Sequence, residues 1–167
     1  MTSKNRPEWF DFCRNANRIA VIGISASGKT ILSQHLSKKL NLPVFHMDSL
    51  YWQPNWQEVP ESVWRAKEVN IIRQDQWIVE GYISKTSLDR LMQADAIIYK
   101  DINGLSACVN GLKRWLKHRN MPRNELPNCP EPFDLRRFKT MLFREERTEI
   151  EDLLLNANVD QKVLRIK

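Results

Sequence analysis

The chain has 167 residues, the usual size of one domain, and its apolar fraction of 42% and charged fraction of 28% are ordinary for a globular protein. These values argue against two independent domains, and no window approaches the roughly 18 apolar residues that a membrane span requires. The net charge of +6 and the pI near 9.4 favour anionic partners, phosphates and nucleic acids alike.

The cysteines and the N-terminal segment favour a cytosolic location for the protein. Cys13, Cys108 and Cys129 are odd in number and widely separated, which indicates reduced thiols rather than a disulfide framework or a metal site. Residues 1–17 lack the continuous apolar core of a secretory signal. We expect this extension to form a short helix on one domain spanning residues 1–167. We also expect a cytoplasmic monomer or dimer without a membrane partner.

The apolar pattern predicts strands that alternate with helices. The run RIAVIG at 18–23 predicts a buried strand, and the apolar spacing from Ile31 to Leu40 predicts a helix that ends at Asn41. Further strands are expected at PVFHMD (43–48), WIVE (77–80), AIIYKD (96–101) and KVLRIK (162–167). Further helices are expected after Pro60 and Glu61, in SKTSLDRLMQ (84–93), along Leu105, Cys108, Val109, Leu112 and Leu116, and from Asp134 to Leu155. This alternation is typical of parallel βαβ units and an α/β fold.

The stretch GISASGKT, between the first strand and the first helix, satisfies the Walker A pattern. Its glycines permit a backbone that turns successive N–H groups inward at a helix N-terminus, which forms a nest for an anion. Lys29 would reach the β- and γ-phosphates of a nucleotide, and the Thr30 hydroxyl would bind Mg²⁺. The alternative is an ordinary glycine-rich turn. The predicted phosphate-binding residues are Gly23, Ser25, Ala26, Ser27, Gly28, Lys29 and Thr30.

Two acidic residues stand at the ends of predicted strands, where ligands bind in open α/β sheets. Asp48 follows VFHM, and Glu80 follows WIV. Either could hold a metal-bound water or orient an acceptor hydroxyl as a base. The alternatives are a helix cap for Asp48 and a structural ion pair for Glu80. With Thr30, these two residues are the predicted magnesium ligands, whereas three scattered histidines do not indicate zinc.

A basic cluster between Lys113 and Arg123 leads into the proline-rich stretch NMPRNELPNCPEP, which excludes regular structure. Such a segment suits a lid over about 114–132 whose arginines offset the charge of a moving phosphoryl group. Arg114 and Arg119 are the predicted catalytic arginines, because a helix fixes their direction. The alternative is a solvated helix face.

Aromatic residues after the second strand suggest an acceptor-binding region over about 49–75. Trp52 and Trp56 could stack on an acceptor ring, although aromatic side chains are also ordinary core material. Gly81 and Tyr82 follow the third strand and could line the same site.

Three segments of the chain resemble the DNA topology modulation protein family, small P-loop proteins similar to adenylate kinases and shikimate kinases. They are RIAVIGISASGKTILSQHLSKKLNLPVFHMDSLYWQPNW, WIVEGYISKTSLDRLMQADAIIYKDI and KRWLKHRNMPRNELPNCPEPFDLRRF. The resemblance covers roughly Arg18 to Arg147. It implies a five-stranded parallel sheet flanked by helices, in the nucleoside-monophosphate-kinase arrangement with strand order 2-3-1-4-5. It also implies an acceptor-binding region after the second strand and an arginine-bearing lid after the fourth.

One departure from related kinases bears on the acceptor. The Asp-Gly pair of those kinases is Glu80-Gly81 here, and the Pro-Arg that follows in adenylate kinases is replaced by Ile83 and Ser84. This difference counts against AMP as the acceptor.

The motifs together predict a kinase that transfers the γ-phosphate of Mg-ATP to a small acceptor such as a nucleoside or nucleotide, or a slow ATPase. ATP is favoured over GTP because no guanine-specific Asn-Lys-x-Asp loop is present. The alternative is a nucleic-acid-associated, ATP-dependent switch that influences DNA topology, with the basic cluster contacting phosphates. This alternative is less favoured, because the sequence shows no helix-turn-helix or zinc-finger signature and a charge of +6 is modest.

Overall fold

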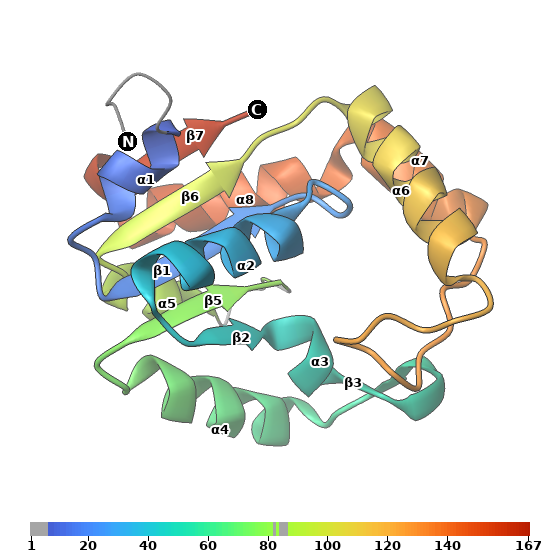
Figure 1. Cartoon of the computed structure of the whole chain (residues 1–167), viewed down its shortest axis with the longest axis horizontal. Helices are drawn as coiled ribbons and strands as arrows, with labels where there is room; N and C mark the ends of the chain where they lie inside the picture. Colours follow the sequence, from blue (N-terminus) through green and yellow to red (C-terminus); the bar gives the residue numbers. More distant parts are fainter. Residues whose placement is uncertain (1–6, 82, 84–86) are drawn as a thin grey trace.

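The computed structural model of the protein describes residues 7–81, 83 and 87–167. At its centre lies a five-stranded sheet in the order β2-β5-β1-β6-β7, and every pairing in it is parallel (Figure 1). Its strands are β1 (Arg18–Gly23), β2 (Val44–His46), β5 (Trp77–Glu80), β6 (Ala96–Lys100) and β7 (Val163–Ile166). Counted without two short hairpin strands, this is the expected order 2-3-1-4-5, so the predicted α/β fold is confirmed.

The register of the sheet aligns the ends of neighbouring strands. Glu80 of β5 pairs with Val21 of β1 on one side and with His46 of β2 on the other. Gly23, the last residue of β1, pairs with Lys100 of β6. The loop after β1 and the carboxylate of Glu80 therefore share the edge at which open parallel sheets bind their ligands.

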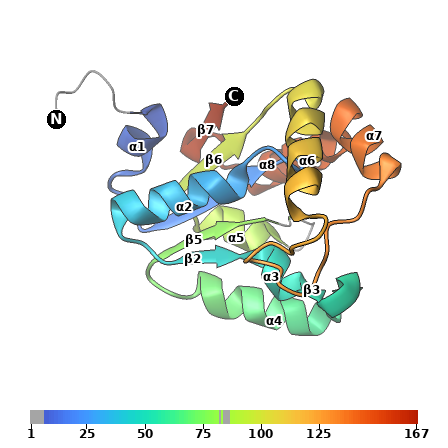
Figure 2. The same cartoon turned by 45° about the vertical axis from the view of Figure 1, so that its right-hand side comes forward.

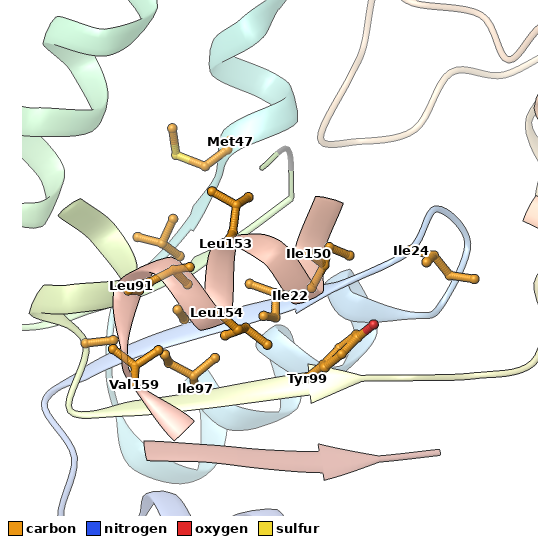
Figure 3. Close-up of a cluster of buried hydrophobic side chains, with 14 of the residues drawn as sticks. Ile22, Ile24, Met47, Leu91, Ile97, Tyr99, Ile150, Leu153, Leu154 and Val159 are labelled. Atoms are coloured by element: carbon orange, nitrogen blue, oxygen red, sulfur yellow. The ribbon is translucent and has the colours of Figure 1, made fainter. Parts of the chain in front are cut away.

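Helices cover both faces of the sheet (Figure 1). They are α1 (Glu8–Cys13), α2 (Lys29–Leu40), α3 (Met47–Tyr51), α4 (Glu61–Ile72), α5 (Leu88–Gln93), α6 (Gly104–His118), α7 (Leu135–Phe143) and α8 (Glu145–Ala157). Because side chains alternate along a strand, β1 contributes side chains to two hydrophobic cores, one on each face of the sheet. Ile19 and Val21 pack with residues of α1 and α2, whereas Ala20 and Ile22 pack with residues of α4, α5 and α8 (Figure 3). Within the part of the chain that the structure describes, no helix is long and apolar enough to cross a bilayer.

The segment after β2 forms a short helix and a hairpin. The expected strand ends at His46, and Asp48 lies in the one-and-a-half-turn helix α3. The strands β3 (Trp52–Gln53) and β4 (Gln57–Glu58) then pair in an antiparallel hairpin around a 3₁₀ turn at Pro54–Trp56. The expected start of the next helix is confirmed, since α4 begins at Glu61 after Pro60. This hairpin presents aromatic side chains beside the carboxyl edge of the sheet.

The single long helix expected from Asp134 to Leu155 is wrong, because the chain breaks at Arg144. This residue adopts the left-handed conformation, with φ of 56°, and ends α7. Its guanidinium pairs with Asp101, which follows β6. Glu145 and Glu146 then occupy the first turn of α8, where the partial positive charge of a helix N-terminus favours acidic side chains. The break brings the start of α8 to the loop after β1.

Helix α6 forms as predicted, but its large apolar side chains face solvent. The exposed fractions are 71% for Leu105, 52% for Val109, 43% for Leu112 and 52% for Leu116. Its buried residues are small instead, and they pack on α7 (Figure 2). A Cβ atom at Gly104 would collide with the Leu142 carbonyl, and one at Gly111 would lie 2.9 Å from the Met141 sulfur. Close packing of α6 on α7 therefore decides which way the basic side chains of α6 point.

A buried ion pair below the site gives a first test of the packing. The Arg90 Nε and the Glu68 Oε1 are 3.5 Å apart, and their side chains are 1% and 3% exposed. Burial raises the pKa of Glu68 and lowers that of Arg90, because desolvation disfavours both charged forms, and each charge partly offsets this effect on the other. Replacing Glu68 by glutamine should lower the free energy of unfolding by about 3 kcal/mol, because it removes the carboxylate that most strongly offsets the burial of the Arg90 guanidinium.

The neighbouring pair of Arg65 and Asp89 provides the control. Its atoms are 3.9 Å apart on side chains that are 49% and 56% exposed, so Asp89→Asn should cost less than about 1 kcal/mol. Urea unfolding of the two variants measures the difference. Equal stability of Glu68→Gln and wild type would contradict the interpretation.

Candidate functional site

The loop between β1 and α2 has the backbone that a phosphate cradle requires. Gly23 has a φ of +146°, and a Cβ atom there would lie 2.5 Å from the Lys100 carbonyl oxygen. Gly28 has a φ of +89° and directly precedes α2. Ala26 is also left-handed, with φ of 58°. Successive turns of this kind direct N–H groups into one concavity at a helix N-terminus, which binds anions.

A carboxylate of the protein already lies on this loop. The Ser25 backbone N–H and the Ser25 hydroxyl both donate to the Glu146 carboxylate, each over 2.6 Å. The Lys29 ammonium turns back on the loop and donates to the carbonyls of Gly23 (2.8 Å) and Ile24 (2.9 Å). The Ser27 hydroxyl is buried and meets no hydrogen-bond partner among the residues that the structure describes. The loop thus binds the Glu146 carboxylate and still has an unused donor, the Ser27 hydroxyl. Its residues therefore fit a polyphosphate.

Thr30 and Glu80 meet beneath the loop. The Thr30 hydroxyl donates to Glu80 Oε1 over 3.2 Å, and the same oxygen is 2.5 Å from His46 Nδ1. This hydrogen bond raises the pKa of His46 above its ordinary value, against the opposing effect of burial. In residues 7–81, 83 and 87–167, His, Cys, Asp and Glu side chains do not gather in threes around a metal position. The hydroxyl and the carboxylate fit the usual P-loop arrangement, in which phosphate oxygens complete the coordination of Mg²⁺.

A pocket of about 310 Å³ joins the loop to the lid, a volume suited to a small ligand. Its lining residues come from the P-loop, the hairpin region, the end of β5, the lid and the two C-terminal helices. They are Gly23, Ser25, Lys29, Asp48, Trp52, Trp56, Gly81, Ile83, Arg114, Arg123, Arg137, Thr140, Met141, Glu146 and Glu149. A Cβ atom at Gly81 would lie 3.0 Å from the Asp48 carboxylate, so the glycine leaves this acid room beside the pocket.

The structure brings most of the predicted site residues together. The P-loop residues Gly23, Ser25 and Lys29 share the pocket with Asp48, Trp52, Trp56, Gly81 and Arg114. Ala26, Ser27 and Gly28 complete the loop, and Thr30 and Glu80 lie together just below it. Tyr82 falls outside the described residues.

The structure does not bring Arg119 to the pocket. Its guanidinium lies over the Trp115 ring, 5.5 Å from the centroid, and its side chain is exposed. Lys113 and Lys117 are exposed as well, whereas Arg114 points inward. The basic cluster is therefore divided between the pocket and solvent.

The lid touches the hairpin region through three hydrogen bonds, at the lower right of Figure 1. The Asn55 N–H donates to the Asn128 carbonyl (3.0 Å), the Trp56 indole N–H to the Pro130 carbonyl (2.7 Å) and the Cys129 thiol to the Gln53 carbonyl (3.1 Å). Trp52 and Trp56 pack edge to face with ring centroids 5.4 Å apart. The proposed lid and the proposed acceptor region are in contact, so the pocket is closed on that side.

Sequence reasoning missed several pocket residues. Arg137 lies on α7 and Arg123 on the lid, and both pair with Glu131, which is nearly buried. Glu146 lies on α8, more than a hundred residues from the loop that it contacts. The acidic pair Glu145 and Glu146 could have indicated the start of a new helix. Only the tertiary fold shows that Glu146 contacts Ser25.

Comparisons with known proteins agree with this geometry at the level of the fold. No protein-family model matches the sequence, and no match to a curated protein is significant. The structure is similar to shikimate kinase from Acinetobacter baumannii in complex with shikimate, with a TM-score of 0.56 at 11% identity, covering 86% of this chain and 83% of that chain. It is also similar to deoxyadenosine kinase from M. mycoides, with a TM-score of 0.50 at 14% identity and 90% of each chain covered.

A third similar structure is a putative kinase from Chloroflexus aurantiacus, with a TM-score of 0.53 at 19% identity, covering 75% of this chain and 77% of that one. The sheet order and these similarities show that the chain has the P-loop fold of nucleoside-monophosphate-kinase-like small kinases.

Proposed function

We propose that the protein is a Mg-ATP-dependent phosphotransferase that acts on a small, hydroxyl- or phosphate-bearing acceptor. One observation carries the proposal: Lys29 of the P-loop, Asp48 and Arg114 line the same pocket. A phosphate donor, a group that orients an acceptor and a cation for the developing charge are the parts that phosphoryl transfer requires. The fold, which is that of small kinases, supports the same reaction class.

Each of these residues has a distinct role in the proposed reaction. The loop amides and Lys29 bind the β- and γ-phosphates, which requires that Lys29 leave the carbonyls of Gly23 and Ile24. Thr30 and Glu80 hold Mg²⁺, which offsets phosphate charge when it is bound. Asp48 orients the acceptor hydroxyl and accepts its proton, and Arg114 stabilises charge on the transferred group. Membership of the DNA topology modulation protein family belongs to the same proposal and rests on the sequence motifs.

A screen for acceptor-dependent release of ADP tests the proposed function. The panel contains nucleosides, nucleotides, sugars and coenzyme precursors, each with Mg-ATP and the wild-type protein. At least one acceptor class should raise ADP release well above the slow hydrolysis of ATP alone. Turnover that stays at the hydrolysis rate across the whole panel would count against a kinase.

The Glu146 carboxylate leads to a prediction about nucleotide affinity. It accepts two short hydrogen bonds from Ser25, one of them from a loop amide that a phosphate would use. A nucleotide must displace it, and charge-assisted hydrogen bonds contribute about 1.5–3 kcal/mol each. Replacing Glu146 by alanine should therefore tighten Mg-ATP binding about tenfold or more, measured by calorimetry.

Glu145 gives the matched control for this variant. It precedes Glu146 in the same helical turn and is exposed, so Glu145→Ala should leave nucleotide affinity unchanged. Unchanged or weaker binding of Mg-ATP by Glu146→Ala would show that this carboxylate does not compete with the nucleotide.

A further inference from the structure

Three arginines of the pocket gather around one carboxylate. The Glu131 Oε1 lies 2.9 Å from Arg114 Nη2 and 3.8 Å from Arg137 Nη1, and its Oε2 lies 3.3 Å from Arg123 Nε. The Glu131 side chain is 4% exposed, whereas the three arginines are 25%, 37% and 16% exposed. They come from α6, α7 and the lid, so the fold assembles this group, called here the arginine cluster, from three separate segments.

The charges of the arginine cluster are unbalanced. Guanidinium groups remain protonated in proteins, so three cations face a single carboxylate and leave an excess of two positive charges. Burial lowers the pKa of Arg114, Glu131 raises it, and Arg123 and Arg137 lower it again by repulsion. The Nε of Arg114 is buried and makes no hydrogen bond to another described residue, and the Nε of Arg123 faces Glu131 without hydrogen-bond geometry. An anion that entered the cluster would relieve the repulsion between the guanidinium groups.

The position of Arg137 ties the cluster to the acceptor side of the pocket. Its guanidinium carbon lies 4.9 Å from the centroid of the Trp56 ring, in a cation–π arrangement. The indole N–H of Trp56 in turn donates to the Pro130 carbonyl, directly before Glu131. The loop after β1 has donors of its own, Lys29 and the Ser25 amide. The cluster therefore offers a separate set of cationic donors, where α6, α7 and the lid meet the hairpin region.

We propose that Arg123 and Arg137 of the arginine cluster bind a carboxylate or phosphate group of the acceptor, while Arg114 keeps its role toward the transferred group, so that the acceptor is an acidic, hydroxyl-bearing small molecule. Arginine forks recognise both oxyanions by paired hydrogen bonds, and the inference is the same for either group. Neutral nucleosides and sugars are then poor acceptors. The identification of the bound anion as the acceptor rests on the proposed kinase function, whereas anion binding by the cluster does not depend on that function.

Titration of inorganic phosphate tests the cluster separately from the P-loop. The background is the Lys29→Ala protein, in which phosphate binding by the loop is weakened and binding by the cluster is retained. Adding Arg137→Met should weaken phosphate binding about tenfold to a hundredfold, since a charge-assisted pair is lost. Arg137 has the longest distance to Glu131, so its removal leaves that carboxylate two closer partners and the fold intact.

Two further variants complete the series. Arg136→Met removes the exposed neighbouring arginine of α7 and should leave phosphate affinity unchanged. Arg137→Lys keeps the positive charge but lacks the paired N–H donors of a guanidinium, so this variant should bind phosphate with intermediate affinity. Melting temperatures of all the proteins confirm that they are folded.

Four results would overturn the proposal. Phosphate that does not bind to the Lys29→Ala protein, or that binds equally well after Arg137→Met, would show that the cluster is not an anion site. Loss of Mg-ATP affinity on Arg137→Met alone, with phosphate binding unchanged, would assign the cluster to the nucleotide instead. A neutral nucleoside or sugar as the best acceptor in the screen would contradict an acidic acceptor. Failure of Mg-ATP to bind the wild-type protein would contradict the proposed kinase function but leave the phosphate titration valid.

Discussion

Replacement of Lys29 by alanine should lower acceptor-dependent ADP release about a hundredfold to a thousandfold. Lys29 is the one residue of the loop whose side-chain charge can follow the γ-phosphate as it leaves, and it lines the pocket. Removal of a single preorganised donor to developing charge costs a factor of this size in other enzymes. Steady-state assays with saturating Mg-ATP measure the effect on kcat, and calorimetry measures the accompanying loss of nucleotide affinity.

Lys39 offers a matched control on the same helix. It lies in the last turn of α2 and is exposed, so Lys39→Ala should retain full activity. Activity of Lys29→Ala within a few-fold of wild type would mean that the loop does not hold the reacting phosphate, even if the protein proved to be a kinase.

Replacement of Asp48 by asparagine should lower kcat about a hundredfold or more while the affinity for Mg-ATP stays unchanged. The substitution keeps the shape of the side chain beside Gly81 and removes its capacity to accept a proton. Because Asp48 lines the pocket on the side of the hairpin, its loss should affect the acceptor step rather than nucleotide binding. The split between kcat and nucleotide affinity separates this role from a structural one.

Glu58 serves as the control for Asp48. It lies in the same region, is exposed and is not among the pocket residues, so Glu58→Gln should behave as wild type. If Asp48→Asn weakened Mg-ATP binding in proportion to its activity, the carboxylate would belong to the metal and nucleotide site. That outcome would favour the magnesium role that the sequence also suggests for this residue.

Local sequence patterns predicted the parts of the fold that depend on neighbouring residues. Short β-branched runs marked the buried strands, and the glycines of GISASGKT marked a loop whose backbone only glycine adopts easily. The order of the strands came from the family resemblance and is confirmed. The strands and the loop could be predicted because each is encoded within a few consecutive residues.

The errors arose where distant residues decide the structure. The helical pattern continues through Arg144, but the chain turns there with a left-handed residue whose side chain pairs with Asp101. In α6 the apolar spacing is correct, yet Gly104 and Gly111 form the buried contact because α7 lies close against them. The sequence contains no local signal for either contact.

The residues of the candidate site also fall into those that local sequence patterns indicate and those that only distant contacts reveal. Lys29, Thr30 and Asp48 were predictable because they belong to one motif or follow directly after a strand. Glu131 and Glu146 were not, because their roles arise from charges on other segments: three arginines for the first and the loop amide of Ser25 for the second. Such residues are found only when the fold places them together.

The central claim is that the backbone between Gly23 and Thr30 binds the polyphosphate of a nucleotide. Calorimetric titration of Mg-ATP and Mg-GTP into the wild-type protein and into Lys29→Ala tests this claim most directly. The wild-type protein should bind Mg-ATP with a dissociation constant of about 1 mM or tighter, and Lys29→Ala should bind it far more weakly. Absence of binding of either nucleotide to the wild-type protein, or equal binding to both proteins, would contradict the account.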